Sequence, residues 1–182
     1  MFSSQDDVRT QLEELDVMLP DGLFVELVIL GGAAMFLYNI DYRMTMDIDV
    51  AFVSGQRAAR LIIEKGEQLG ISAQAHGIAF LSGDWETRVK WLAWSFKHLR
   101  VGVLDPYDWV LSKLARWRGN DEDDVKAILP RLDSEELFTR LQDSLPDYIG
   151  REREIQITWN ILAEEMGYKG KFALTLLPPG LA

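Results

Sequence analysis

The sequence predicts an α/β (α+β) fold: a mixed β-sheet with flanking helices, followed by a helical C-terminal part. Strand and helix patterns alternate over the first half of the chain, and helical patterns dominate the last third. The chain has 182 residues, of which 48% are hydrophobic, so it can bury a sizeable core. We expect a first domain over residues 1–130 and a C-terminal helical extension over 131–182 that packs on it.

The first 70 residues contain clear periodic patterns. Apolar residues at helical spacing predict an amphipathic N-terminal helix, and the β-branched run FVELVIL predicts a buried strand that ends at a glycine pair. From Arg43 the pattern changes to period two, which is typical of a strand with one wet and one buried face. The elements expected here are a helix over 4–18, a strand over 24–30, a short helix over 33–40, a strand from Arg43 onward and a helix over 54–70 closed by Gly70.

The remaining residues hold further strands and then helices. Asp105 and Pro106 form the start signal of a helix, with the aspartate as N-cap and the proline at the first helical position. The expected strands are GIAFL (77–81), ETRVKWLAW (86–94) and LRVGVL (99–104), and the expected helices cover 105–117, 121–129, 134–145 and 155–166.

The composition excludes several classes of protein. Without cysteine, the chain has neither disulfides nor thiolate chemistry. A formal net charge of −10 argues against bulk DNA binding and indicates a soluble protein, so any nucleic-acid contact must be local. The N-terminus lacks the basic and apolar regions of a signal peptide, and no window approaches 18 apolar residues. We therefore expect a cytoplasmic protein without a membrane span.

The glycine pair Gly31 and Gly32 lies between the first strand and a helix. Backbone N–H groups at such a helix start attract phosphate, and glycine lets a ligand approach the backbone closely. The alternative is a tight turn that only requires positive φ, and the pair alone does not decide between them.

Asp47 and Asp49 are two like charges one residue apart in the predicted strand. Residues i and i+2 of a strand project from the same face, about 6.6 Å apart. Carboxylates at that spacing can share Mg²⁺, which also removes their repulsion; the alternative is a solvated strand. Arg43 and Thr45 share this polar face, where Arg43 can contact phosphate oxygens or pair with an aspartate.

The stretch GGAAMFLYNIDYRMTMDIDV resembles the signature of the minimal nucleotidyltransferases of the DNA polymerase β superfamily. It is most similar to bacterial nucleotidyltransferase-like families with the pattern G-G-x-A followed by R-x-T-x-D-I-D. These families are related to nucleotidyltransferase toxins of abortive-infection toxin–antitoxin systems. The segment LDPYDWVLSKLARWRGNDEDDVKAIL (104–129) resembles their later block, so the resemblance covers about residues 24–130.

The resemblance implies functional residues in this later block. Lys113 would reach a triphosphate, and Asp121 would be the later acid, with Asp124 as its neighbour at i+3. The residues themselves leave this open. Lys113, Arg116 and Arg118 form a basic cluster that can hold phosphate or an RNA backbone, or can be a solvated helix face. Acids at a helix start are also what the helix dipole favours.

A third catalytic carboxylate is missing from the pattern. The superfamily often places one on a strand after the Asp-x-Asp strand, where residues 71–103 offer only Asp84 and Glu86. We nominate Glu86, which the predicted strand would place on one face with Arg88 and Lys90.

These observations predict a Mg²⁺-dependent nucleotidyltransferase that moves a nucleoside monophosphate from an NTP, such as ATP, to a hydroxyl of a protein, RNA or small molecule. Asp47 and Asp49 would hold the metal. The resemblance also implies a cognate partner protein in a toxin–antitoxin pair. The alternative is a catalytically silent module of the same fold that binds nucleotide or a partner protein, which the missing acid favours.

Overall fold

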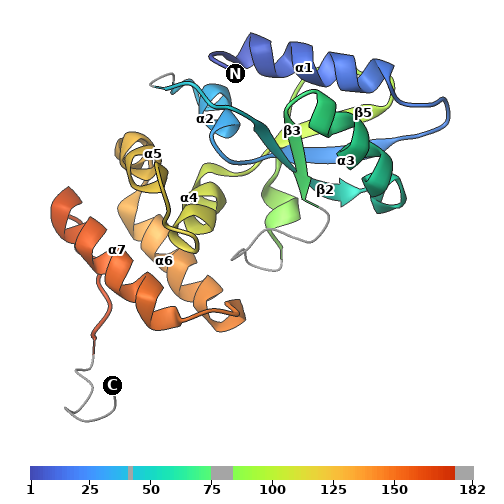
Figure 1. Cartoon of the computed structure of the whole chain (residues 1–182). Helices are drawn as coiled ribbons and strands as arrows, with labels where there is room; N and C mark the ends of the chain where they lie inside the picture. Colours follow the sequence, from blue (N-terminus) through green and yellow to red (C-terminus); the bar gives the residue numbers. More distant parts are fainter. Residues whose placement is uncertain (41–42, 75–83, 175–182) are drawn as a thin grey trace.

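The computed structural model describes residues 1–40, 43–74 and 84–174, and confirms the predicted fold class (Figure 1). The described residues form one five-stranded mixed sheet surrounded by helices. The strands are β1 (Val25–Ile29), β2 (Ile48–Ser54), β3 (Ile71–Gln74), β4 (Lys90–Trp91) and β5 (Leu99–Val103). The helices are α1 (Gln5–Val17), α2 (Ala33–Leu37), α3 (Ala59–Gln68), α4 (Pro106–Leu114), α5 (Asp121–Ile128), α6 (Ser134–Ser144) and α7 (Glu152–Met166).

The strand order β3-β2-β1-β5-β4 places β1 at the centre of the sheet. β1 runs antiparallel to β2 and parallel to β5, while β3 is parallel to β2 and β4 is antiparallel to β5. The carboxyl ends of β1 and β5 and the start of β2 therefore meet at one edge of the sheet. Ligands of open α/β sheets bind at such an edge.

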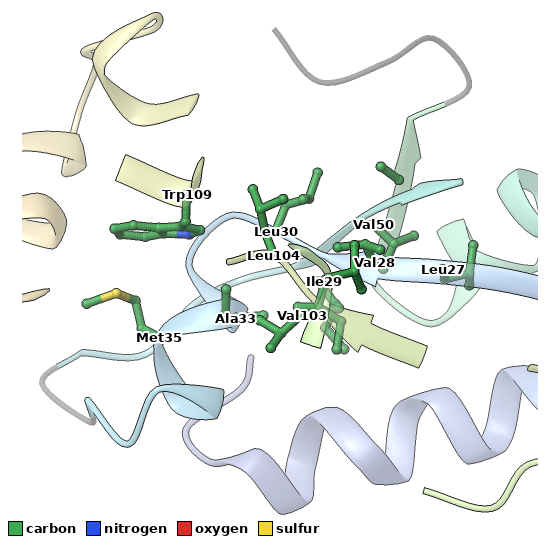
Figure 2. Close-up of a cluster of buried hydrophobic side chains, with 14 of the residues drawn as sticks. Leu27, Val28, Ile29, Leu30, Ala33, Met35, Val50, Val103, Leu104 and Trp109 are labelled. Atoms are coloured by element: carbon green, nitrogen blue, oxygen red, sulfur yellow. The ribbon is translucent and has the colours of Figure 1, made fainter. Parts of the chain in front are cut away.

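β1 is central because its sequence is almost entirely apolar. Leu27, Val28 and Ile29 are fully buried, as the run of β-branched residues predicts. They belong to a cluster that also holds residues of β2, α2 and α4 (Figure 2). The packing of this cluster fixes the end of β1, and with it the glycine turn that follows.

Helix α1 lies along the sheet and contacts both α2 and α3 (Figure 1). It begins at Ser4, whose side chain accepts a hydrogen bond from the Asp7 N–H, and it buries Val8, Leu12 and Leu15. Gly70 follows α3 with a φ of 68°, which confirms its predicted role in ending that helix.

Helices α4 to α7 gather at one end of the sheet (Figure 1). The Asp105 side chain caps α4 by accepting from the Tyr107 N–H, and Pro106 occupies the first turn, as predicted. α4 contacts α5, α6 and α7, and one continuous hydrophobic core runs from α1 to Trp159 of α7. The predicted division at residue 130 stays a prediction.

Two predicted strands differ from the structure, and one lies outside the described residues. The strand expected from Arg43 begins only at Ile48, because Thr45 instead makes an isolated bridge with Phe2. Met44 and Met46, the apolar residues of the alternating pattern that follows Arg43, are exposed rather than on a buried face. The strand expected over 86–94 is found only at Lys90–Trp91 (β4): the chain forms a 3-10 turn over Trp85–Arg88, and residues 92–94 are not in a strand. The strand expected over 77–81 lies outside the described residues.

None of the described helices combines the length and the apolarity that crossing a bilayer requires. Trp109 and Trp159, at the centre of the helical part, are its largest fully buried side chains.

Candidate functional site

The turn Gly31–Gly32 connects β1 to α2 at the edge where β1, β2 and β5 meet. Gly31 has a φ of 56°, and a Cβ built on it would lie 2.0 Å from Oδ2 of Asp49. The Leu30 N–H also donates to the Asp49 carbonyl at 2.8 Å. A side chain here would adopt a strained φ and push the Asp49 carboxylate aside, so glycine is strongly favoured at this position.

The second glycine of the turn lies against the chain before β2. A Cβ on Gly32 would be 2.8 Å from Thr45 Oγ1 and 3.2 Å from a terminal nitrogen of Arg43. Among the described residues, the backbone N–H groups of Gly31 and Gly32 have no hydrogen-bond acceptor. The turn therefore presents two backbone N–H donors without acceptors, and Asp49, Thr45 and Arg43 lie next to it.

Asp47 and Asp49 lie in different environments. Asp49 is half-buried in β2, whereas Asp47 precedes the strand and is exposed. Burial raises the pKa of Asp49, and the neighbouring Asp47 carboxylate raises it further; Arg116 and Lys113 partly oppose both effects. The two acids are therefore close enough to repel each other, and Arg116 and Lys113 of the helical part act on the Asp49 carboxylate.

Arg43 is tied to the helical part of the fold. Its Nε and one terminal nitrogen donate to the two carboxylate oxygens of Asp124, each at 2.6 Å. The carboxylate of Asp124 is fully buried. Such a bidentate pair fixes the guanidinium plane, so Arg43 connects the segment before β2 to α5.

Lys113 is buried between two aspartates of α5. Its side chain is 3% exposed, and Nζ donates to Asp121 Oδ1 and to Asp124 Oδ2, both at 2.8 Å. Nζ also lies 5.0 Å from the ring centroid of Trp109. The ammonium group predicted to reach a triphosphate is thus engaged by protein carboxylates in this structure.

Arg116, unlike Lys113, keeps a large exposed surface. Its side chain is 50% exposed while its guanidinium donates to both oxygens of Asp121, at 3.0 and 2.7 Å. Hydrogen bonding to Asp121 raises the pKa of Arg116, and the charges of Asp49 and Asp124 act in the same direction.

Asp121 holds two cations and one backbone donor at once. Burial alone would raise its pKa, but hydrogen bonds from Arg116 and Lys113, and from the Arg118 backbone, lower the pKa to about 2. Asp121 therefore stays ionised, and its four contacts hold the Arg116 side chain in place. A carboxylate with so low a pKa is a weak proton acceptor.

Glu86 does not lie on a strand, which corrects the predicted placement. It lies in the 3-10 turn before β4 and is exposed. Arg88, expected to share a strand face with Glu86, pairs instead with buried Asp108 through two hydrogen bonds of 2.8 and 2.9 Å and with Asp84 at 2.6 Å. In the described part of the chain, no group of three or more acidic or histidine side chains is arranged to hold a metal ion.

One contact at the site could not be read from the sequence patterns. The Trp109 indole N–H donates to the Gly31 carbonyl at 2.9 Å. The usual need of a buried tryptophan for an acceptor was the available signal.

His98 is buried, with Nδ1 3.0 Å from the Leu23 carbonyl and its backbone N–H bound to Asp16, so it is a structural histidine.

Replacing Gly31 with alanine is expected to destabilise the protein by about 2 kcal/mol more than replacing Gly119 with alanine. Both glycines have a φ of 56°, so the backbone cost of about 1–2 kcal/mol is shared. A Cβ on Gly119 meets nothing within 4 Å, whereas at Gly31 it meets Asp49. Urea unfolding of both variants measures the difference. Equal destabilisation would contradict the close packing of the turn on Asp49.

Comparison with known proteins gives one family and one solved structure. Residues 7–166 match the family described as nucleotidyltransferase of unknown function (DUF6036). The chain is also similar in structure to an antigenic nucleotidyltransferase-like protein from Paracoccidioides brasiliensis, with a TM-score of 0.50, 14% identity and 90% of each chain covered. At this identity the similarity concerns the fold alone. The comparison with curated proteins gives no match.

Proposed function

This chain belongs to the nucleotidyltransferase family matched by residues 7–166, and from this premise we propose that it transfers a nucleoside monophosphate from a Mg²⁺-bound NTP to an acceptor hydroxyl. The family and the fold confirm the resemblance predicted from residues 24–130. The metal, the nucleotide and the acceptor belong to our proposal. An acceptor among proteins, RNA or small molecules, a cognate partner protein, a toxin–antitoxin role and a cytoplasmic location stay predictions.

The observation that carries the proposal is the contact between the glycine turn and Asp49. Two backbone N–H groups without acceptors lie beside a half-buried carboxylate. An NTP bound as its metal complex needs donors for its phosphate oxygens and carboxylates for its cation. This edge of the sheet brings both together, although the two segments are 18 residues apart in sequence.

The donor set fits magnesium. Mg²⁺ is usually bound through one or two carboxylates together with substrate phosphates, and Asp47 and Asp49 are two neighbouring carboxylates; burial and then the charge of Asp47 raise the pKa of Asp49. Asp47 and Asp49 would hold the ion. When bound, it would polarise the phosphate and stabilise charge on the attacking and leaving oxygens.

The other site residues bind and orient the phosphates in this proposal. Gly31 and Gly32 donate their N–H groups to phosphate oxygens, and half-exposed Arg116 neutralises their charge. Thr45 and Arg43 lie against Gly32 and hold the turn in position. The ammonium group of Lys113 remains bound to two carboxylates. Lys113 therefore acts on the phosphates only through its charge and not through a direct hydrogen bond.

In the transfer, the acceptor oxygen forms a bond to the α-phosphorus, the bond from that phosphorus to the bridging oxygen breaks, and pyrophosphate leaves. The proton of the hydroxyl passes to a base. Asp121 is a poor candidate for the base because its pKa is about 2, so we assign it the role of holding Arg116. Glu86 remains the nominated base as a prediction.

A catalytically silent module that binds nucleotide is the second candidate. The arrangement of acids favours it, because the described residues contain no group of three metal-ligating side chains. The two candidates share the site and differ only in whether label is transferred.

Incubation with NTPs labelled at the α-phosphate, together with Mg²⁺ and a cell extract, tests the proposal. We expect label on an acceptor, and release of pyrophosphate when the label is instead at the γ-phosphate. Transfer of γ-label would indicate phosphoryl transfer and contradict the proposal. Binding without transfer across all four NTPs would favour the silent module, and absence of both would exclude the two candidates. Addition of EDTA serves as the control for metal dependence.

A further inference from the structure

Trp109 lies in the first turns of α4 and is fully buried. Its indole N–H donates to the carbonyl of Gly31 at 2.9 Å. In Figure 2 the ring lies between α4 and the start of α2, above Met35, with its nitrogen directed toward the turn that follows Leu30. The donor therefore contacts the peptide unit that joins the two glycines of the turn.

The peptide bond between Gly31 and Gly32 is planar and trans. In such a unit the N–H points away from the C=O, so the direction of one fixes the direction of the other. With the Gly31 carbonyl held by Trp109, the Gly32 N–H is directed away from the indole. That N–H has no acceptor among the described residues, although buried or half-buried donors are usually paired.

The indole is itself held on two sides. Tyr38 packs edge-on against it with ring centroids 6.0 Å apart, and the Tyr38 hydroxyl donates to the Leu104 carbonyl at 2.7 Å. The Lys113 ammonium lies 5.0 Å from the ring centroid. A ring fixed by these neighbours can fix its own hydrogen bond, whereas glycine alone leaves the turn free to rotate.

We propose that Trp109 is a positioning residue that aims the Gly32 N–H at a phosphate oxygen of the bound NTP. This inference rests on the proposed function and deepens it, because it assigns the phosphate contact to one oriented peptide unit. Trp109 touches no reacting atom and acts through Gly31.

Trp159 provides a matched control within the same chain. It is also a fully buried tryptophan, and its indole N–H also donates to a glycine carbonyl, that of Gly170, at 2.9 Å. Trp109→Phe and Trp159→Phe each remove one such bond, so both should lower thermal stability to a similar extent. Only Trp109→Phe should affect nucleotide binding.

The experiment titrates the wild type, Trp109→Phe and Trp159→Phe with each of the four NTPs in Mg²⁺ by calorimetry. We expect Trp109→Phe to weaken NTP binding roughly three- to tenfold, the effect of one hydrogen bond, and Trp159→Phe to leave it unchanged. Trp109→Phe should weaken binding of the corresponding monophosphate less, because a monophosphate has fewer phosphate oxygens that can accept from the Gly32 N–H. Equal NTP affinity of Trp109→Phe and wild type would overturn the inference but leave the proposed function intact.

If the wild type binds none of the NTPs, both the proposed function and the inference fail. If Trp109→Phe does not fold, benzothienylalanine at position 109 keeps the shape of the indole and replaces only its N–H. The same loss of affinity is then expected, together with a changed amide resonance of Gly32, and an unchanged affinity would again overturn the inference.

Discussion

Replacing Asp47 and Asp49 together with asparagine will abolish Mg²⁺-dependent NTP binding and lower any transfer rate by at least about a thousandfold, or ~4 kcal/mol of transition-state stabilisation. Asparagine keeps the size of each side chain and removes the charge that a divalent cation requires. Calorimetry with each NTP, with and without Mg²⁺, measures the first effect, and label transfer measures the second.

The double variant should fold as well as the wild type. Burial and the Asp47 charge raise the pKa of Asp49, so the charged form is less stable in the folded protein than in water, and removing both charges relieves this cost. We expect an unchanged or higher melting temperature. A matched control replaces exposed Asp6 and Asp147 with asparagine, which removes the same two charges from elements without site residues. NTP binding by the site variant at wild-type affinity would refute the metal assignment.

The parts of the fold that sequence reasoning predicted depend on close neighbours in the chain. The apolar run of β1 has to be buried, the glycine pair has to turn, and Asp105 with Pro106 has to begin a helix. Each pattern carries its physical cause within a few residues. The same is true of Gly70, whose positive φ ends α3.

The segment before β2 shows where such reasoning fails. Its alternation of polar and apolar residues is that of a strand, but the contacts that decide its path come from distant residues. Phe2 forms the bridge with Thr45, and Asp124, 81 residues away, holds Arg43. These contacts outweigh the local propensity, and Met44 is exposed as a result.

Glu86 was misplaced for the same reason. Glutamate, arginine and lysine at alternate positions predicted a strand face, yet Arg88 pairs with buried Asp108 of α4, and the chain around it forms a 3-10 turn. The basic cluster of Lys113, Arg116 and Arg118, of which only Lys113 lies in α4, was equally undecidable from sequence. Whether Lys113 is solvated or buried depends on α5 folding back over it, which brings Asp121 and Asp124 to its ammonium.

Replacing Lys113 with methionine is therefore expected to destabilise the protein strongly, by about 3–5 kcal/mol. Methionine preserves the length and the apolar contacts of the stem but leaves two buried carboxylates short of a cation. Asp121 retains Arg116 and Asp124 retains Arg43, so the network weakens without vanishing. Urea unfolding at pH 7 measures the loss. Lys126→Met is the matched control, since Lys126 also donates to two carboxylates, Glu122 and Glu165, but at the surface, where screening by water leaves little to lose.

The pH dependence separates this charge effect from a packing effect. The folded-state pKa of Asp121 is about 2 and its unperturbed value is 3.8, so its contribution to stability is complete above pH 4 and is lost as the pH falls toward 2. Removing the Lys113 ammonium raises the pKa of Asp121 toward its unperturbed value, so the stability difference between the wild type and Lys113→Met should shrink as the pH falls from 4 toward 2. A packing defect would lower stability equally at every pH. Parallel stability curves for the variant and the wild type between pH 3 and pH 7 would therefore show that the ammonium does not act through Asp121. The ion network would then not be what holds Arg116 and the glycine turn in position.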